Sequence, residues 1–333
     1  MTRYLVKTGV VLCLVALLGA AGCSREEVLD ISRYRSVVLR VPSDVAVVQR
    51  TPGDPGNGSS LQMPRHLYFF IEYLADGNTR PLVSAISLND LTPDSWTAVS
   101  DSHGTVLAYQ RTVQLPLPET DEVTLYAIAS YTPIPDLQTT VDGVRSGATP
   151  ISGQEVAGLR LNPAQTDGST VSIADVYAGS GTLLTDENAV NETIVCYHVA
   201  AKFDVVYNLS DDFRTGGPYE EWRVHSFTLK DLLTEGSYFS PGANTSASAT
   251  GQCVFDGMTP ANNFYGRFDT YLFQPAPDAD GNISLSWEVV LVRGDETRTL
   301  PSVSTAEKVS ADGAAYFRLD LTINGIGDGS GND

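Results

Sequence analysis

The sequence predicts an all-β protein built from two β-sandwich domains in tandem. Val, Ile, Thr, Tyr and Phe alternate with polar residues at a period of two along most of the chain, which is the pattern of half-buried strands. Gly, Asp, Asn and Pro interrupt this pattern at short intervals, and helical periodicity is almost absent. The strand-like segments form two runs, each of about seven strands, divided near residues 185–190. A single large barrel is the alternative.

The first run begins with "SVVLRV" at residues 36–41 and continues, after Pro42, with residues 45–50. A loop rich in Pro, Gly, Asn and Ser follows. Residues 66–88 then predict a hairpin whose turn is Asp76-Gly77-Asn78. After the hairpin we expect strands at residues 106–117, 123–131, 156–161 and 170–173, with a long Pro-, Thr- and Gly-rich connection from 132 to about 152.

The second run begins with "ETIVCYHVAAKFDVVYNL" at residues 192–209, which predicts one long strand with apolar residues on both faces at its centre. The further strands of this run are expected at residues 221–233, 253–258, 265–275, 282–292, 296–303 and 314–323. The predicted domains are therefore an N-terminal sandwich over residues 36–187 and a C-terminal sandwich over residues 188–326, followed by a polar tail at 327–333.

The N-terminus has the pattern of an export signal. Arg3 and Lys7 precede an apolar segment at residues 9–21, which is shorter than the roughly 20 residues that a membrane-spanning helix requires. The segment ends in "LGAAGC", which resembles the end of a bacterial lipoprotein signal. The resemblance implies a signal peptide over residues 1–22 and lipidation of Cys23, followed by a tether at residues 23–35. An ordinary cleaved signal is the alternative.

Charge narrows the classes of partner. Cleavage before Cys23 would remove Arg3 and Lys7 but no acidic residue, which takes the formal net charge from −19 to −21. A chain this acidic, without a basic patch, is not expected to bind nucleic acid or an anionic lipid surface. Its acidity is typical of a soluble domain displayed on a cell exterior.

Two cysteines remain for the folded part, because Cys13 lies in the signal and Cys23 is the lipidation site. Cys196 and Cys253 could form a disulfide in an oxidising compartment. Both lie in apolar strand-like segments, so two buried thiols are an equally natural outcome.

The sequence offers no catalytic residues, metal site or cofactor site. The four histidines are scattered, and none lies at metal-ligand spacing from another or from a cysteine: His66, His103, His198 and His225. Nucleophile-elbow, phosphate-loop and dinucleotide motifs are absent from the sequence. We therefore expect a protein that is not an enzyme.

Two short segments resemble binding motifs, but each is also explained by a simple turn. Arg293-Gly294-Asp295 is the tripeptide that integrins recognise, and it would also form a simple hairpin turn. Residues 277–284, "PDADGNIS", are similar to a calcium loop, but Val289 occupies the position of the bidentate glutamate. We expect a turn at both places.

Residues 172–185, "SIADVYAGSGTLLT", followed by 197–209, "YHVAAKFDVVYNL", resemble phrases of the fimbrillin superfamily of Bacteroidetes. The ending "YFRLDLTINGIG" at residues 316–327 is similar to the last strand of that family. The resemblance implies two transthyretin-like, Greek-key sandwiches and a role as a subunit, tip or anchor of type V pili. The polar C-terminus after Ile326 favours an accessory, tip or anchor component.

The resemblance also implies assembly by strand exchange, in which proteolysis after an arginine removes the first strand and a strand of another fimbrial subunit fills the groove. The candidate cleavage points are Arg40 and Arg50, and the loop that follows Arg50 favours the latter. The acidic residues after Cys23 resemble export signals to the outer face of the outer membrane. The implied partners are other fimbrial subunits, the outer membrane through the lipid, and host or bacterial surface ligands.

A surface glycan-binding lipoprotein is the alternative function. Its aromatic platform would be drawn from the three tryptophans, Trp96, Trp222 and Trp287.

Overall fold

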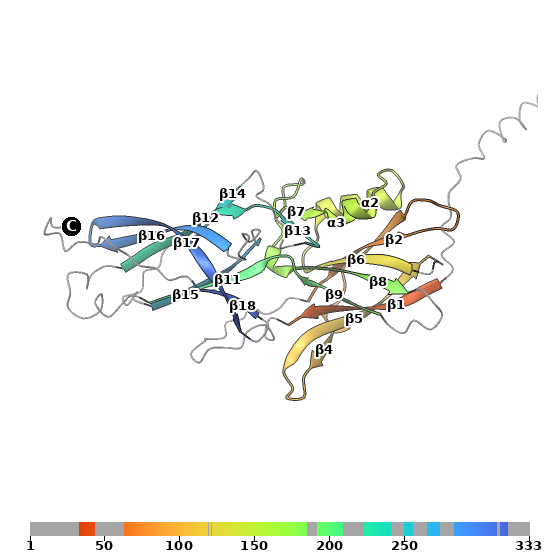
Figure 1. Cartoon of the computed structure of the whole chain (residues 1–333), viewed down its shortest axis with the longest axis horizontal. Helices are drawn as coiled ribbons and strands as arrows, with labels where there is room; N and C mark the ends of the chain where they lie inside the picture. Colours follow the sequence, from red (N-terminus) through yellow and green to blue (C-terminus); the bar gives the residue numbers. More distant parts are fainter. Residues whose placement is uncertain are drawn as a thin grey trace, which may run out of the picture.

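The computed structural model describes residues 33–43, 63–118, 120, 122–184, 192–208, 223–240, 250–255, 265–273, 283–311 and 314–318. Most of these residues lie in strands, so the all-β prediction is confirmed. Figure 1 shows an elongated arrangement, with the strands of the N-terminal half at one end and those of the C-terminal half at the other.

Two sheets form the N-terminal half. One has the strand order β4-β5-β1-β9 and the other has the order β10-β8-β6-β2-β3. The strands are β1 (Arg33–Pro42), β2 (His66–Tyr73), β3 (Leu82–Leu88), β4 (Thr97–Ser100), β5 (Val106–Leu117), β6 (Glu122–Ser130), β8 (Val176–Leu184), β9 (Glu192–Val195) and β10 (Tyr197–His198). The predicted hairpin at residues 66–88 is present as β2 and β3, with Gly77 at φ 80° in its turn.

Strand β2 explains how this half is layered. Its sequence, "HLYFFIEY", is apolar on both faces because both faces are covered. Leu67, Phe69 and Ile71 lie in the core between the two sheets. Tyr68 and Phe70 point the other way, into a second core on the outer face of the five-stranded sheet.

Helices cover part of that outer face, which corrects the expectation of an irregular connection there. The helices are α2 (Pro135–Arg145) and α3 (Gly153–Ala157), and Figure 1 shows them above the sheet that contains β6 and β8. Leu137, Val141 and Val144 of α2 are buried, at spacings of four and three residues. A capping box between Ser152 and Glu155 begins α3.

The two short strands predicted near α3 are wrong. Residues 156–161 contain the end of α3 and the two-residue strand β7 (Arg160–Leu161). Residues 170–173 contribute only an isolated bridge between Ala164 and Thr170.

The expected long strand at residues 192–209 is divided into three. β9 pairs with β1 in parallel, β10 pairs with β8, and β11 (Ala201–Asn208) pairs with β15 of the C-terminal half. The chain therefore crosses from one sheet of the first sandwich to the other before it enters the second half.

The C-terminal half consists of a five-stranded sheet in the order β14-β12-β16-β17-β18 and the two-stranded sheet β11-β15. The strands not yet named are β12 (Arg223–Leu233), β13 (Gly236–Ser237), β14 (Thr250–Phe255), β15 (Tyr265–Leu272), β16 (Ile283–Arg293), β17 (Glu296–Ala311) and β18 (Ala314–Arg318). Trp287 stacks on Phe227 at a ring-centroid distance of 5.4 Å, and both side chains are buried.

Candidate functional site

The first strand, β1, lies inside its sheet and not at an edge. Ten residue pairs join it to β5 in antiparallel orientation, from Arg33↔Leu117 to Pro42↔Ala108. Four pairs join it to β9 in parallel orientation, from Val37↔Glu192 to Arg40↔Val195. Figure 1 shows β1 beside β5.

The side chains of β1 alternate between the core and the outer face. Val37, Leu39 and Val41 are at most 1% exposed and lie in the core between the two sheets. Burying one such side chain stabilises a protein by about 1.5–3 kcal/mol, so the three together contribute about 5–9 kcal/mol. That sum is comparable with the whole stability of a typical domain, about 5–15 kcal/mol.

Removal of β1 would therefore leave a groove that needs a new occupant. Its walls would be β5 and β9, whose backbone groups would lose their partners. The core that it would expose is apolar and includes Val113 and Leu115 of β5. An extended segment with apolar residues at every second position fits such a groove, because it restores both the ladder and the core.

Arg40, one of the two predicted cleavage points, lies within β1 and is held on both sides. Its Nη2 donates a hydrogen bond to Gln110 Oε1 at 3.2 Å, and its carbonyl accepts one from the Cys196 amide at 2.8 Å. A protease needs an accessible, unpaired segment, so this placement argues against cleavage at Arg40 in the folded chain. Arg50 and the lipidation site Cys23 lie outside the described residues.

Cys196 is a free thiol, fully buried where the chain passes from β9 to β10. Burial raises the pKa of this thiol from its ordinary value of 9.0 to about 12. Cys253 lies on β14 of the C-terminal half, where its Cα pairs with that of Leu229. Cys196 is thus a free and buried thiol in the structure, and its pairing with Cys253 stays a prediction.

Two of the three tryptophans are core residues. Trp96 is 7% exposed and donates its indole N–H to the carbonyl of Pro64 at 2.9 Å, and Trp287 is 3% exposed. Neither can stack on a surface glycan. Trp222 lies outside the described residues.

The structure describes the integrin-like tripeptide, but most of the calcium-like loop lies outside the described residues. Arg293 ends β16 and Glu296 begins β17, so Gly294 and Asp295 form an exposed hairpin turn, as expected. Residues 277–282 lie outside the description. Among the described residues, no group of three His, Cys, Asp or Glu side chains could hold a metal ion.

Sequence reasoning missed the seam between the two halves. Strand β7 of the first half pairs with β13 of the second, and the Tyr238 amide donates to the carbonyl of Leu159 at 3.2 Å. Arg160 and Glu235 form an ion pair across this seam at 2.8 Å. Tyr238 and Phe273 from the second half are buried in the outer core of the first, with Tyr68 and Phe70.

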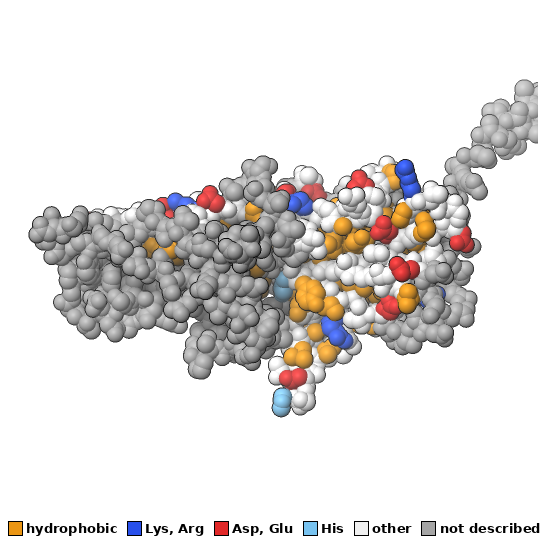
Figure 2. Space-filling model, in the orientation of Figure 1, with side chains coloured by type: hydrophobic (Ala, Val, Ile, Leu, Met, Phe, Trp, Pro, Cys, Tyr) orange, Lys and Arg blue, Asp and Glu red, His pale blue; other side chains and the backbone are white. Residues whose placement is uncertain are grey.

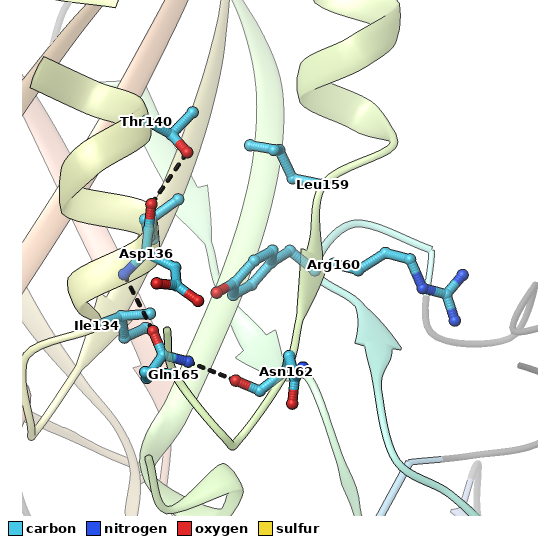
Figure 3. A pocket seen from close by; sticks show the side chains of 9 residues that line it. Ile134, Asp136, Thr140, Leu159, Arg160, Asn162 and Gln165 are labelled. Carbon is cyan, nitrogen blue, oxygen red and sulfur yellow. Dashed lines mark hydrogen bonds between the residues drawn. The ribbon is translucent and has the colours of Figure 1, made fainter. Parts of the chain in front are cut away.

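A small cavity of about 90 Å³ lies at the seam, and Figure 3 shows how its side chains are arranged. The Asp136 amide, at the start of α2, donates to Gln165 Oε1 at 3.0 Å, and the Gln165 side-chain amide donates to the carbonyl of Asn162. The Asp136 carboxylate accepts the Thr166 amide at 3.1 Å. These hydrogen bonds fasten the loop after β7 to the start of α2.

Surface charge is dispersed on the face that Figure 2 shows. In the coloured part of this face, acidic side chains stand singly among uncharged and apolar ones. In the described part of the chain, no helix is both long and apolar enough to span a bilayer.

No family model and no curated protein matches the chain. Solved structures do resemble it. A fimbrial assembly protein from Parabacteroides distasonis has a TM-score of 0.43 and 11% identity, with 81% of this chain and 86% of that chain covered. A protein from the same organism that is assigned to cell adhesion has a TM-score of 0.47 and 14% identity, with 82% and 80% covered. A protein from Bacteroides thetaiotaomicron that is assigned as an adhesin has a TM-score of 0.38 and 12% identity, with 82% of each chain covered. At this level of similarity, the function has to be argued from the chain's own residues.

Proposed function

We propose that this protein is a structural and adhesive component of surface fimbriae, an accessory, tip or anchor subunit that assembles by β-strand exchange. The observation that carries the proposal is the position of β1. This strand supplies three core side chains, lies between two other strands, and forms the first described segment of the chain. Removal of β1 would therefore leave an apolar groove between β5 and β9.

The same proposal places the protein at the outer membrane. Lipidation at Cys23 would anchor the N-terminus, and the tether and β1 would join that anchor to the sandwich. Cleavage after Arg50 would then free the body of the protein from its anchor as well as from its first strand. An uncleaved chain would stay at the membrane as an anchor component, and a cleaved one would become available for assembly.

The experiment is treatment of the purified chain with an arginine-specific protease, with Arg50→Lys and Arg40→Lys as a matched pair of variants. Both substitutions keep the charge and remove the cleavage site. We expect wild type and Arg40→Lys to lose residues before 51 and to form oligomers, and we expect Arg50→Lys to do neither. A wild-type chain that is neither clipped nor oligomeric after treatment would contradict assembly through β1.

A peptide tests the groove itself. The peptide "RYRSVVLRVP", which corresponds to β1, should bind the clipped chain and block its oligomers. The control peptide has Ser in place of Val37, Leu39 and Val41, which removes the core contacts but keeps the backbone donors and acceptors. Equal inhibition by the two peptides would mean that the groove does not select an apolar strand.

A further inference from the structure

We propose that the groove which β1 occupies selects the outward-facing side chains of the strand that fills it, through Gln110 and Gln114 of β5. This inference rests on the proposed function, because it concerns the strand that would replace β1. It names the class of partner, which is an extended segment with apolar side chains on its inner face. On its outer face this segment carries a hydroxyl and, four residues later, a guanidinium.

The two glutamines lie on the outer face of the four-stranded sheet. Val113, between them in the sequence, is buried in the core, and the side chains of a strand alternate between its faces. The register of β5 with β1 sets Gln114 opposite Ser36 and Gln110 opposite Arg40. The position of β1 therefore shows which side chains of a strand in this groove meet the glutamines.

Each glutamine is hydrogen-bonded to the side chain of β1 that lies opposite it. Gln114 Nε2 donates to Ser36 Oγ at 2.6 Å, and Arg40 Nη2 donates to Gln110 Oε1 at 3.2 Å. A guanidinium can only donate, whereas a hydroxyl can donate or accept. The bond at Arg40 is partly buried and has a charged donor, so we expect it to be the stronger of the two.

The apolar side chains alone do not determine where an incoming strand stops. A strand with apolar residues at every second position can shift by two residues and still direct them into the core. Such a shift moves each outer side chain by about 7 Å along β5, too far for a serine hydroxyl to reach Gln114. The core thus selects alternation, and the glutamines select the register.

The glutamines also select a direction. β1 pairs with β5 in antiparallel orientation over ten residue pairs, from Arg33↔Leu117 to Pro42↔Ala108. In this orientation the residue opposite Gln114 precedes the residue opposite Gln110 in the incoming chain. A partner strand therefore has the hydroxyl first and the guanidinium second, with apolar residues at the alternate positions.

The first measurement is competition for the groove of the clipped chain, after the protease has been inhibited. A labelled peptide "RYRSVVLRVP" takes the place of the released strand, and unlabelled variants that keep its three core residues compete with it. The variant Ser36→Val with Val38→Ser keeps the composition and moves the hydroxyl opposite Thr112. We expect it to bind about fivefold more weakly. The control Val38→Thr changes the outer face between the two glutamine contacts and should bind like the original peptide.

The second measurement is a double-mutant cycle on the arginine, because loss of a positive charge can weaken binding to an acidic protein at any position. The peptide variant Arg40→Ala is measured on the clipped chain with Gln110 and on the clipped chain with Gln110→Ala. We expect a loss of about tenfold in the first case and of at most about twofold in the second. The same cycle in the uncleaved chain, measured as the equilibrium constant of unfolding in urea, requires neither proteolysis nor exchange.

The outcomes separate this inference from the proposed function. Equal affinity of all the peptides for the clipped chain would overturn selection by the glutamines and leave strand exchange standing. A clipped chain that binds none of the peptides would overturn strand exchange through β1, and this inference with it. Independent effects of Arg40→Ala and Gln110→Ala in the uncleaved chain would overturn selection of the guanidinium, whatever the clipped chain does.

Discussion

Gly179 of β8 shows how one residue permits the chain to change sheets. A Cβ at this position would meet the carbonyl of Val195, at the point where the chain leaves β9 for β10. Two residues on, a Cβ at Gly181 would lie 2.7 Å from Ile194 Cδ1. The glycines that weaken the strand pattern of "VYAGSGTLL" are therefore required by close approach from another part of the chain. Sequence alone could not predict β8, because this requirement is tertiary.

Gly179→Ala should lower the free energy of unfolding by about 1–3 kcal/mol, because the added methyl group forces the Val195 backbone to move. Gly158→Ala is the matched control. A Cβ there would lie 3.4 Å from the Gln154 carbonyl, an ordinary contact, and we expect a change within about 0.5 kcal/mol. Urea unfolding of both variants checks the prediction, and equal effects would contradict it.

Cys196 should resist alkylation in the folded chain, because burial raises its pKa to about 12 and removes it from solvent. We expect iodoacetamide at pH 8 to label Cys196 only after unfolding, as read by peptide mass mapping. Labelling of Cys196 in the native chain at the rate of the unfolded chain would show that the thiol is accessible.

The same thiol should make stability depend on pH in the alkaline range. Between pH 9.0 and about 12 the unfolded state releases the Cys196 proton and the folded state keeps it. Stability should therefore fall as the pH rises, by about 1.4 kcal/mol for each pH unit from this group. Cys196→Val should remove that contribution, and an unchanged slope in the variant would contradict the prediction.

Residue roles were predicted from the sequence with mixed success. Cys253 lies in a strand as expected, whereas Cys196 lies between β9 and β10, because the chain changes sheets at that point. Trp96 was considered as part of a surface aromatic platform. It is buried because its indole N–H reaches the carbonyl of Pro64, which no local pattern reveals.

At the scale of elements, the strands with strong alternation were predicted well. The hairpin at residues 66–88 and the strands at 106–117 and 123–131 match β2, β3, β5 and β6 closely. Helix α2 was missed because residues 132–152 were interpreted as a Pro-, Thr- and Gly-rich connection, although Pro135 at the start of the helix and the buried residues Leu137, Val141 and Val144 follow helical rules. The capping box of α3 could also have been recognised from the sequence. The parallel pairing of β1 with β9 could not, because no local sequence signal encodes which strands pair.

β1 offers a test of its two faces by single substitutions. Leu39→Ala should lower the free energy of unfolding by about 2–5 kcal/mol, because Leu39 is 1% exposed in the core. Its neighbour Val38 points to the outer face, so Val38→Ala should cost less than about 1 kcal/mol. Chemical denaturation of the uncleaved chain checks both values, and a larger loss for Val38→Ala would mean that the outer face is covered.

At the scale of the whole molecule, the seam makes the two halves one cooperative unit. The outer core of the first sandwich is incomplete without Tyr238 and Phe273, which belong to the second half. Burial also raises the pKa of Tyr238, so its phenol stays neutral within that core. Two sandwiches in sequence were predictable from strand counting, but their shared core was not, because it joins residues as far apart in the sequence as Tyr68 and Tyr238.

The double variant Tyr238→Ala with Phe273→Ala should uncouple the halves. Each truncation of a buried aromatic residue costs about 3–5 kcal/mol, and both losses fall on the seam. In calorimetry we expect one unfolding transition for the wild type and two for this variant. Tyr197→Ala is the control, because Tyr197 is 64% exposed, and it should keep one transition. Two transitions already present in the wild type would contradict the cooperative unit.

The two-sided pairing of β1 also determines how the protein responds to force. A pull on the chain at Arg33 runs along β1, and the hydrogen bonds to β5 and β9 lie across that direction. Such a pull loads all these bonds in shear at the same time, whereas a pull across the sheet would open them one after another. Tension on the N-terminus should therefore be resisted by all of these hydrogen bonds together. In the proposed function, a cut beyond the far end of β1 would leave this strand held to the body only by these hydrogen bonds and by its core side chains.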